Sequence, residues 1–392
     1  MADAATTRHP EQAPARGRFQ STLRGLFRTS LIPALAVFLG LLAGAIVIVV
    51  ANALAGNGWN FLLPIEAYAS MLEGALGGVD EIVRTLTEAT PLILTGLAVA
   101  VGFKAGLFNI GANGQFLIGA LAAAAVGAAV ADLSPLVAIP LALGAGMLFS
   151  ALYGFIPGAL KAFTGAHEVV TTIMLNIIAA SMVAFLVTGP LEAPGFTFAR
   201  TGDIGNAAYP ALGDANSTAH LGIIIAFLAV PVIYWLLNRS VFGFEIRMVG
   251  ANPSAARYAG IRAGRIVILT MSLSGMLAGM AGAGQVLGIT GFVSASFSTT
   301  AGFDAITIAL LGRVHPVGVL LASLLFGVMR AGSALMQIRV RVPVEIIDLI
   351  QAMILLFLTA DILVRWIFRI RAQKAELAEL KTITRTYGQA TR

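Results

Sequence analysis

Residues 266–289 read IVILTMSLSGMLAGMAGAGQVLGI and contain no charged side chain. About 20 apolar residues in an α-helix cross roughly 30 Å of hydrocarbon, so this run is long enough to span a membrane. The preceding residues, 238–265, read NRSVFGFEIRMVGANPSAARYAGIRAGR and carry six charges, five of them arginines. Before them lies another apolar run, 219–237, without Asp, Glu, Lys or Arg. The alternation predicts two transmembrane helices joined by a basic segment in water.

The composition extends this pattern to the whole chain. Of 392 residues, 58% are hydrophobic and 11% are charged, whereas soluble domains have about 25% charged residues. A mean hydropathy of +0.89 indicates many apolar runs, so we expect a polytopic membrane protein. The chain has no cysteine and its four histidines are scattered, so neither a metal site nor another cofactor is predicted. The polar, arginine-bearing N-terminus shows no signal-peptide cleavage site, and we expect it to be retained.

Ten apolar runs are candidate spans. They are 31–55, 89–105, 111–131, 134–158, 168–189, 219–237, 266–289, 302–312, 315–335 and 346–368. The run 302–312 is too short to cross alone unless the Ser/Thr-rich residues from Phe292 onward contribute. Ser294, Ser296, Ser298, Thr299 and Thr300 in that lead-in are compatible with an outer vestibule or with a simple outer loop.

Basic residues set the orientation, because lysine and arginine are enriched in cytoplasmic loops. With both termini in the cytoplasm, only Arg84, Arg200, Arg339 and Arg341 of the 25 basic residues lie outside, and Arg330 falls inside a span. We therefore predict an all-α polytopic membrane protein with about ten transmembrane helices and cytoplasmic N- and C-termini. Its parts are an N-terminal tail (1–29), a transmembrane domain (30–371) that includes the cytoplasmic loop 238–265, and a C-terminal tail (372–392).

That loop contains a short helix with its own start and stop signals. Asn252 can cap the first free N–H groups, Pro253 suits the first helical position, and Gly260 suits the left-handed residue that ends a helix. A helix of two turns is only marginally stable in water, so its Ala/Tyr face needs a surface to pack against. Two such surfaces are compatible with the residues: anionic lipid, or a cytoplasmic protein.

Three stretches carry a resemblance to a known family. FGFEIRMVGANPSAARYAGI (242–261) resembles the cytoplasmic coupling loop of ABC importer permeases. GFKAGLFNIGANGQFLIGA (102–120) and GAHEVVTTIMLN (165–176) resemble two further motifs of the same group, in the same order. The group is the branched-chain amino acid, ribose and simple-sugar permease superfamily, and its nucleoside permeases are the most similar. The resemblance covers roughly residues 60 to 370.

The resemblance implies a division of labour between subunits. This chain would be a permease without enzyme activity, and an ABC ATP-binding subunit, a second homologous permease and an extracytoplasmic substrate-binding (lipo)protein would be its partners in a bacterial or archaeal plasma (inner) membrane. No P-loop motif surrounds any of the four lysines, so ATP would be hydrolysed by the partner. The candidate residues for coupling to the ATPase are Glu245, Arg247, Asn252, Pro253, Ala255, Ala256, Arg257, Tyr258 and Gly260.

Neutral polar residues mark the candidate substrate path. After a predicted helix break at Gly106, Asn109 and Asn113 are four apart and would share a helix face. Unwound backbone is tolerated in a membrane only where it lines a cavity or packs in protein. A nucleoside offers hydroxyls, ring nitrogens and a flat ring, which suit amides and phenylalanines. The candidates here are Phe108, Asn109, Asn113, Gln115 and Phe116. Each asparagine has an equal alternative, an interhelical hydrogen bond.

The following motif supplies the other candidates, Glu168, Thr172 and Asn176, which could face inward from one helix. For Glu168 the favoured role is to complement the positive end of its helix. Gly275 and Gly279, with Gly282 and Gly284, predict close helix packing.

Two rival functions remain open. The same machinery could carry ribose or another simple sugar. An ion-coupled secondary transporter would instead need a buried ionisable group in mid-span, and the available acids, Glu168, Asp304, Asp348 and Asp361, lie near predicted span ends.

Overall fold

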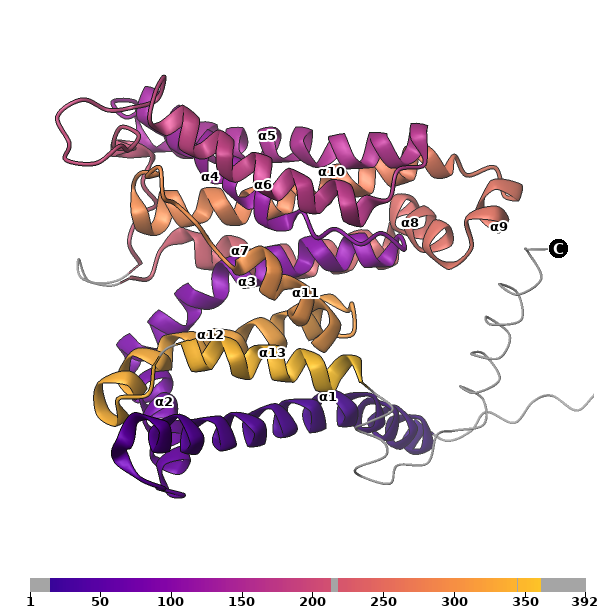
Figure 1. Cartoon of the computed structure of the whole chain (residues 1–392). Coiled ribbons are helices and arrows are strands. Elements are labelled where there is room, and N and C mark those ends of the chain that lie inside the picture. Colours follow the sequence, from indigo (N-terminus) through magenta and orange to yellow (C-terminus); the bar gives the residue numbers. More distant parts are fainter. Residues whose placement is uncertain (1–14, 213–217, 344, 361–392) are drawn as a thin grey trace, which may run out of the picture. The chain divides into compact units, whose positions relative to one another are not determined.

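The computed structural model describes residues 15–212, 218–343 and 345–360. Its regular elements within these residues are all helices, apart from two isolated β-bridges (Figure 1). The α-helices are α1 Ala15–Asn52, α2 Leu63–Leu76, α3 Val79–Lys104, α4 Ala112–Ala129, α5 Pro135–Thr164, α6 Glu168–Val187, α7 Leu221–Arg239, α8 Val241–Ala251, α9 Pro253–Tyr258, α10 Ala263–Gln285, α11 Ala301–Leu311, α12 Pro316–Val340 and α13 Glu345–Thr359. The predicted all-α class is confirmed.

The chain divides into two compact units. Among the described residues, one unit joins 15–43 to 352–360, and the other is Gly44–Gln351. In the first unit, Gly40 of α1 packs against Ile354 of α13. Helix α1 begins at Ala15, inside the predicted N-terminal tail, whereas the predicted C-terminal tail lies outside the described residues.

Eight of the described helical segments are long and apolar enough to cross a membrane. They are Pro33–Asn57, Val79–Lys104, Ala112–Ala129, Pro135–Thr164, Glu168–Val187, Leu221–Arg239, Ala263–Thr290 and Pro316–Val340. Each coincides with a predicted span. The largest difference is at α3, which begins at Val79 and not at 89 because its charged first turns are also helical.

The two remaining predicted spans are not confirmed. Helix α11 has 11 residues, too few to cross a bilayer alone. Helix α13 ends at Thr359, and residues 361–368 of the predicted span 346–368 lie outside the described residues. The structure also contains α2, which lies between the first two predicted spans, 31–55 and 89–105. There, Gly74 packs against Gly332 and Leu335 of α12.

The ten-span arrangement therefore stays a prediction, and single-cysteine labelling tests it. Because the chain has no cysteine, each introduced thiol is the only target in it. We expect cysteines at Arg18, Ser254 and Gln373 to react from the cytoplasm, and cysteines at Gly78 and Gly205 to react from outside. Opposite sidedness of Ser254 and Gln373 would contradict the ten-span arrangement.

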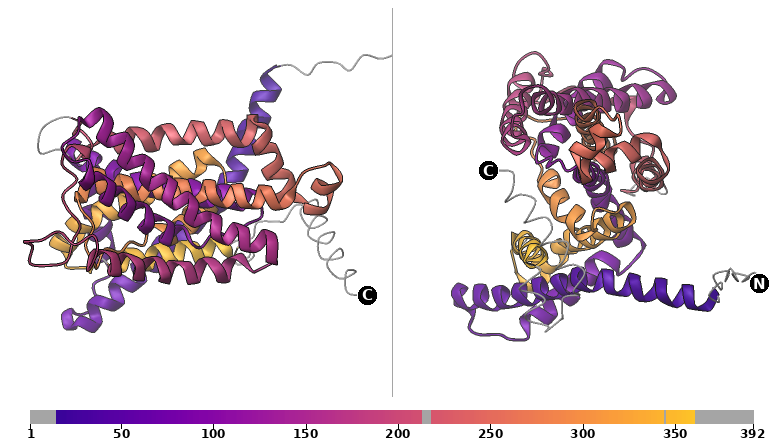
Figure 2. Two further views of the ribbon diagram at one scale, coloured as in Figure 1. Left: turned by 90° about the horizontal axis from the view of Figure 1, so that it is seen from above. Right: turned by 90° about the vertical axis from the view of Figure 1, so that its right-hand side faces the viewer.

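Glycines bring the central helices of the second unit close together. Helices α4, α5, α6 and α10 lie side by side in two views (Figure 1, Figure 2). A Cβ added at Gly275 or Gly279 would meet Ser150 of α5, and one at Gly282 would meet the carbonyl oxygen of Phe116. The predicted close packing is confirmed for these three glycines. It is wrong for Gly284, which has open space around its Cβ position.

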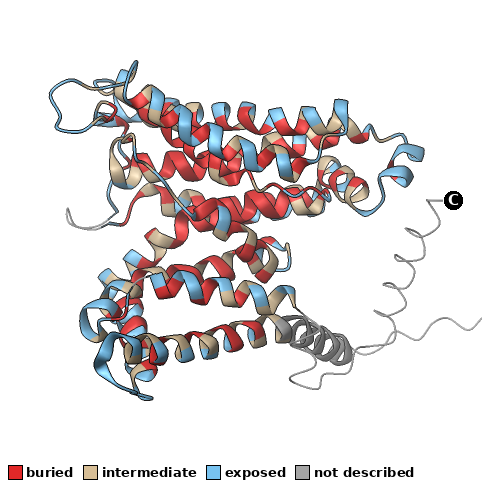
Figure 3. Ribbon diagram, in the orientation of Figure 1, coloured by how far each residue is buried: buried red, intermediate tan, exposed pale blue. Residues whose placement is uncertain are grey.

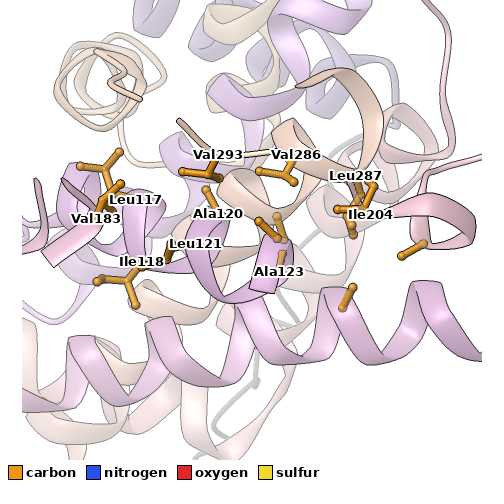
Figure 4. Close-up of a cluster of buried hydrophobic side chains, with 14 of the residues drawn as sticks. Leu117, Ile118, Ala120, Leu121, Ala123, Val183, Ile204, Val286, Leu287 and Val293 are labelled. Atoms are coloured by element: carbon orange, nitrogen blue, oxygen red, sulfur yellow. The ribbon is translucent and has the colours of Figure 1, made fainter. Parts of the chain in front are cut away.

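The buried residues lie mainly on the central helices of this unit. Helices α3, α4 and α10 are largely buried, whereas most residues of α5 and α6 are exposed or only partly buried (Figure 3). An apolar cluster joins α4, α6 and η3 (Val286–Thr290), and includes Leu117, Leu121, Val183 and Leu287 (Figure 4). The exposed apolar faces of α5 and α6 suit lipid, and the buried interior positions the polar residues described below.

The connection between α6 and α7 forms backbone hydrogen bonds with the segment that follows η3. Arg200 and Ser294 form an isolated antiparallel bridge, and the N–H of Thr201 donates to the carbonyl of Val293 at 2.9 Å. The Arg200 guanidinium lies between two rings, 4.0 Å from the centre of Phe196 and 3.8 Å from that of Phe292. Such stacking is favourable because the ring face is negative. From this anchor the chain leads through the Ser/Thr-rich residues into α11.

Candidate functional site

Helices α3 and α4 are separated by a break at residues 105–111. Gly106 adopts a left-handed backbone (φ +70°), and the N–H of Leu107 donates back to the carbonyl of Gly102 at 3.0 Å. Asn109 lies in this non-helical turn, and its side-chain oxygen accepts the N–H of Gly111 at 3.0 Å. The predicted break at Gly106 is confirmed. The expectation that Asn109 and Asn113 share a helix face is wrong, because only Asn113 is helical.

The side chain of Asn109 joins three elements. It is 1% exposed, and its amide nitrogen donates to Gln115 Oε1 and to Ser274 Oγ of α10, each at 2.8 Å. Ser274 Oγ in turn donates to the carbonyl of Ala98 in α3 at 2.6 Å. Burial of these groups is tolerated because they satisfy one another. Ser274 was not a candidate from the sequence, since a lone serine in an apolar run gives no signal.

Asn176 connects α6 to the same break. Its amide nitrogen donates to the carbonyl of Ile110 at 2.9 Å, and its oxygen accepts the N–H of Gly114 at 2.7 Å. One amide side chain thus pairs two backbone groups that the break leaves without helical partners. Thr172, one turn earlier in α6, donates to the carbonyl of Glu168 at 2.7 Å and lies beside Gly111.

Glu168 begins α6 and forms an ion pair across the α5–α6 turn. Lys161 Nζ lies 2.5 Å from Glu168 Oε2, and the glutamate side chain is 8% exposed. The backbone of Phe108, which belongs to the break, also stabilises the negative charge of this carboxylate. The sequence analysis favoured a role at the positive end of the helix. Glu168 is at that end, but its partner is Lys161, which was not a candidate.

The remaining path candidates surround the start of α4. Asn113 Oδ1 is buried and has no hydrogen-bond partner among the described residues. Gly302 of α11 packs against the backbone of Asn113. Phe116 is buried and stacks with Phe297, with ring centres 6.4 Å apart. Phe108 is half exposed, unlike the buried candidates.

These differences between the two asparagines give a matched pair of variants. We expect Asn109→Ala to cost about 1–3 kcal/mol of stability, because it leaves the Gln115 side chain and the Gly111 N–H unpartnered and removes one of the two hydrogen bonds of Ser274. Asn113→Ala removes an oxygen without a partner among the described residues, so it should leave the assembled protein intact. If Asn113 contacts cargo, its variant weakens uptake. Thermal unfolding and uptake measured on both variants check this, and equal unfolding temperatures would contradict the expected difference.

The predicted coupling segment, residues 238–265, contains two helices at the opposite end from the α6–α7 connection (Figure 1). Helix α8 was not separately predicted, and the Ser240 hydroxyl caps it by accepting the N–H of Gly243 at 2.9 Å. Helix α9 has the predicted signals. Asn252 Oδ1 accepts the N–H groups of Ser254 and Ala255, each at 3.0 Å, and Gly260 has a φ of +82°.

The two faces of α9 differ in a way that the sequence did not reveal. Ala256 is 0% exposed, so it packs against the chain and cannot contact a partner directly. Tyr258 is 95% exposed, and Ala255 and Arg257 are also exposed. In α8, Glu245 and Arg247 are half buried, and the positive charge of Arg247 acts on Lys104 at the end of α3.

Helix α8 contacts the α3–α4 break through backbone. A Cβ at Gly250 would collide with the carbonyl oxygen of Lys104 and with Ala105, and one at Gly106 would meet the backbone of Gly250. The coupling segment is thus in direct contact with the turn that precedes Asn109. A displacement of α8 and α9 would therefore reach the buried amides through a short, closely packed route.

Several known proteins are similar to this sequence over most of its length. Residues 81–359 match the family described as branched-chain amino acid transport system / permease component. A guanosine ABC transporter permease protein of Bacillus subtilis (strain 168), NupP, is 37% identical over 86% of this chain and 95% of its own. A nucleoside ABC transporter permease protein of Lactococcus lactis subsp. cremoris (strain MG1363), NupB, is 37% identical over 92% and 98%. A glucose ABC transporter permease protein of Haloferax volcanii, TsgB13, is 34% identical over 83% and 86%.

No solved structure matches the chain. The match to the family covers well over half of the sequence, so the chain belongs to this family of ABC transporter permeases. It is a multi-pass membrane protein and a transport component, not an enzyme. The resemblance seen in the three motifs is confirmed.

Proposed function

We propose that this chain forms the translocation path of an ATP-driven importer for nucleosides. The observation that carries the proposal is the group of amides at the α3–α4 break, Asn109, Gln115 and Asn176, with the phenylalanine pair Phe116 and Phe297 beside it. Amide groups can exchange hydrogen bonds with a nucleobase, and an aromatic ring can stack on its face. The similarity to permeases named for guanosine and nucleosides supports the same cargo.

The buried amides already have hydrogen-bond partners in this conformation, so cargo would reach them when the break changes shape. The contact of α8 with the break supplies a route for that change. The exposed face of α9, with Arg257 and Tyr258, would receive the ATP-binding subunit. A second homologous permease and an extracytoplasmic binding protein would complete the importer in a bacterial or archaeal plasma membrane, with the termini in the cytoplasm.

A sugar is the second candidate cargo, because one relative is named for glucose. Competition separates the two. In proteoliposomes that contain the complete importer, excess unlabelled guanosine should block the uptake of a labelled nucleoside, whereas equal concentrations of ribose or glucose should not. Uptake of labelled ribose or glucose that nucleosides fail to inhibit would contradict the nucleoside assignment.

A further inference from the structure

Helix α12 carries an arginine inside its span, and that arginine is paired with an acid of α11. Arg330 and Asp304 form an ion pair. Arg330 Nη2 also donates to Thr300 Oγ1 at 2.7 Å, and the Thr300 hydroxyl donates to Asp304 Oδ2 at 3.0 Å. The sequence analysis noted Arg330 within a span and Asp304 near the end of another, but gave neither a role.

The lengths of the two helices place this pair within the hydrocarbon layer. At about 1.5 Å per residue, Arg330 lies roughly 21 Å from the start of α12 and roughly 15 Å from its end. Helix α11, with 11 residues, covers only about half of a 30 Å layer. Its last turn contacts the start of α12, where Gly312 packs on Val319, so Thr300 and Asp304 begin it at an interior level.

The pair is also incompletely covered by the chain. The side chains of Arg330 and Asp304 are 21% and 18% exposed, and Thr300 is exposed. A charge in a span is costly when it faces lipid and is found facing a water-filled cavity or protein. The exposed edge of this pair is therefore expected to face protein or a water-filled cavity of the assembled transporter, and not lipid.

Further polar groups lie on α13. The negative charge of Asp348 acts on Asp304. Gln351 follows one turn later on the same side of α13, because residues three apart are neighbours on a helix. It is 3% exposed, and neither its amide oxygen nor its amide nitrogen has a hydrogen-bond partner among the described residues. A buried amide without partners has unused donors and acceptors, which is the capacity that a polar solute requires.

We propose that Arg330, Asp304 and Thr300 form a cargo-binding contact on the wall of the translocation path, and that it takes a neutral, hydroxyl-bearing solute such as a nucleoside. The proposal rests on the proposed function and adds a contact apart from the α3–α4 break. The carboxylate accepts hydrogen bonds from two neighbouring hydroxyls of a ribose, and the guanidinium donates to a carbonyl or ring nitrogen. The alternative is an ion pair that only fastens α11 to α12.

Thiol accessibility separates a path-facing position from one that faces lipid. Thr300→Cys should react with a small cationic methanethiosulfonate reagent in the assembled importer, and saturating guanosine with its binding protein and ATP should slow the reaction at least about tenfold. The matched control is Leu321→Cys, an exposed apolar position of α12 that should face lipid and stay unreactive. An unreactive thiol in the Thr300→Cys variant, or one whose rate guanosine leaves unchanged, would overturn the proposal.

Exchanging the charges of Asp304 and Arg330 distinguishes cargo binding from an ion pair that only joins α11 to α12. We expect Asp304→Asn to raise the cargo concentration needed for half-maximal uptake at least about tenfold. The doubly exchanged variant, Asp304→Arg with Arg330→Asp, should assemble and remain equally impaired, because donor and acceptor have changed places. Restored uptake in the exchanged variant would overturn the proposal. If that variant fails to assemble, the labelling of the Thr300→Cys variant decides. Guanosine uptake by the unaltered protein is measured in parallel, and its absence would count against the proposed function and not against this contact.

Discussion

Replacing Tyr258 by Asp is expected to abolish the stimulation of ATP hydrolysis by cargo-loaded binding protein. The side chain is 95% exposed, so the change removes almost no internal packing and the chain should fold and insert normally. An exposed aromatic ring on a short, capped helix is a suitable anchor for a partner, and tyrosines are enriched among residues that dominate interfaces. ATPase activity of the reconstituted complex, measured with and without loaded binding protein, checks this.

Tyr258→Phe is the matched control, because it keeps the ring and should keep the stimulation. If both variants are stimulated like the unaltered protein, α9 does not dock the ATPase. A change confined to the dependence on anionic lipid would instead favour the lipid-bound helix. Ala256→Glu is not an informative test of docking, because Ala256 is buried in the chain and a charge there disturbs folding.

Gly250→Ala is expected to uncouple ATP hydrolysis from uptake. The new Cβ would collide with the carbonyl oxygen of Lys104, so α8 must move away from the α3–α4 break. Overpacking of this kind costs about 1–3 kcal/mol, enough to separate two closely packed elements without unfolding a helical bundle. Uptake should fall at least about tenfold while ATP hydrolysis continues, and the ratio of cargo moved to ATP hydrolysed measures the loss.

Gly264→Ala provides the comparison at the same end of the bundle. A Cβ at Gly264 would meet only Ala162, at 3.6 Å, which is an ordinary contact. This variant should couple normally and be slightly more stable, since alanine favours a helix over glycine by up to about 1 kcal/mol. Equal coupling ratios in the two variants would show that the contact of α8 with the break does not transmit motion.

Local signals predicted much of this structure. Apolar runs of sufficient length located the eight long helices, because the cost of exposing backbone in lipid forces such runs to be helical. Asn252, Pro253 and Gly260 located α9, because capping depends on neighbouring residues only. Composition did not distinguish the faces of that helix. Ala255 and Ala256 are identical in type, and tertiary packing alone decides that one is exposed and the other buried.

Contacts between distant residues were the part that the sequence could not supply. Asn109 and Ser274 are 165 positions apart, and nothing near either residue indicates the other. Arg330 pairs with Asp304 across a turn whose geometry depends on two adjacent left-handed residues, Arg313 and Val314. The break at Gly106 was predicted, but the helical spacing applied to Asn109 failed because the turn extends through it.

The most direct test of the central claim measures whether ATP or an ion gradient drives uptake. Labelled guanosine is offered to proteoliposomes that contain this chain, its permease and ATPase partners and the loaded binding protein, with ionophores that collapse all ion gradients. The account predicts uptake that requires hydrolysable ATP, persists with the ionophores, and stops when this chain is omitted. Uptake by this chain without the ATPase, driven by an ion gradient and abolished by the ionophores, would contradict it.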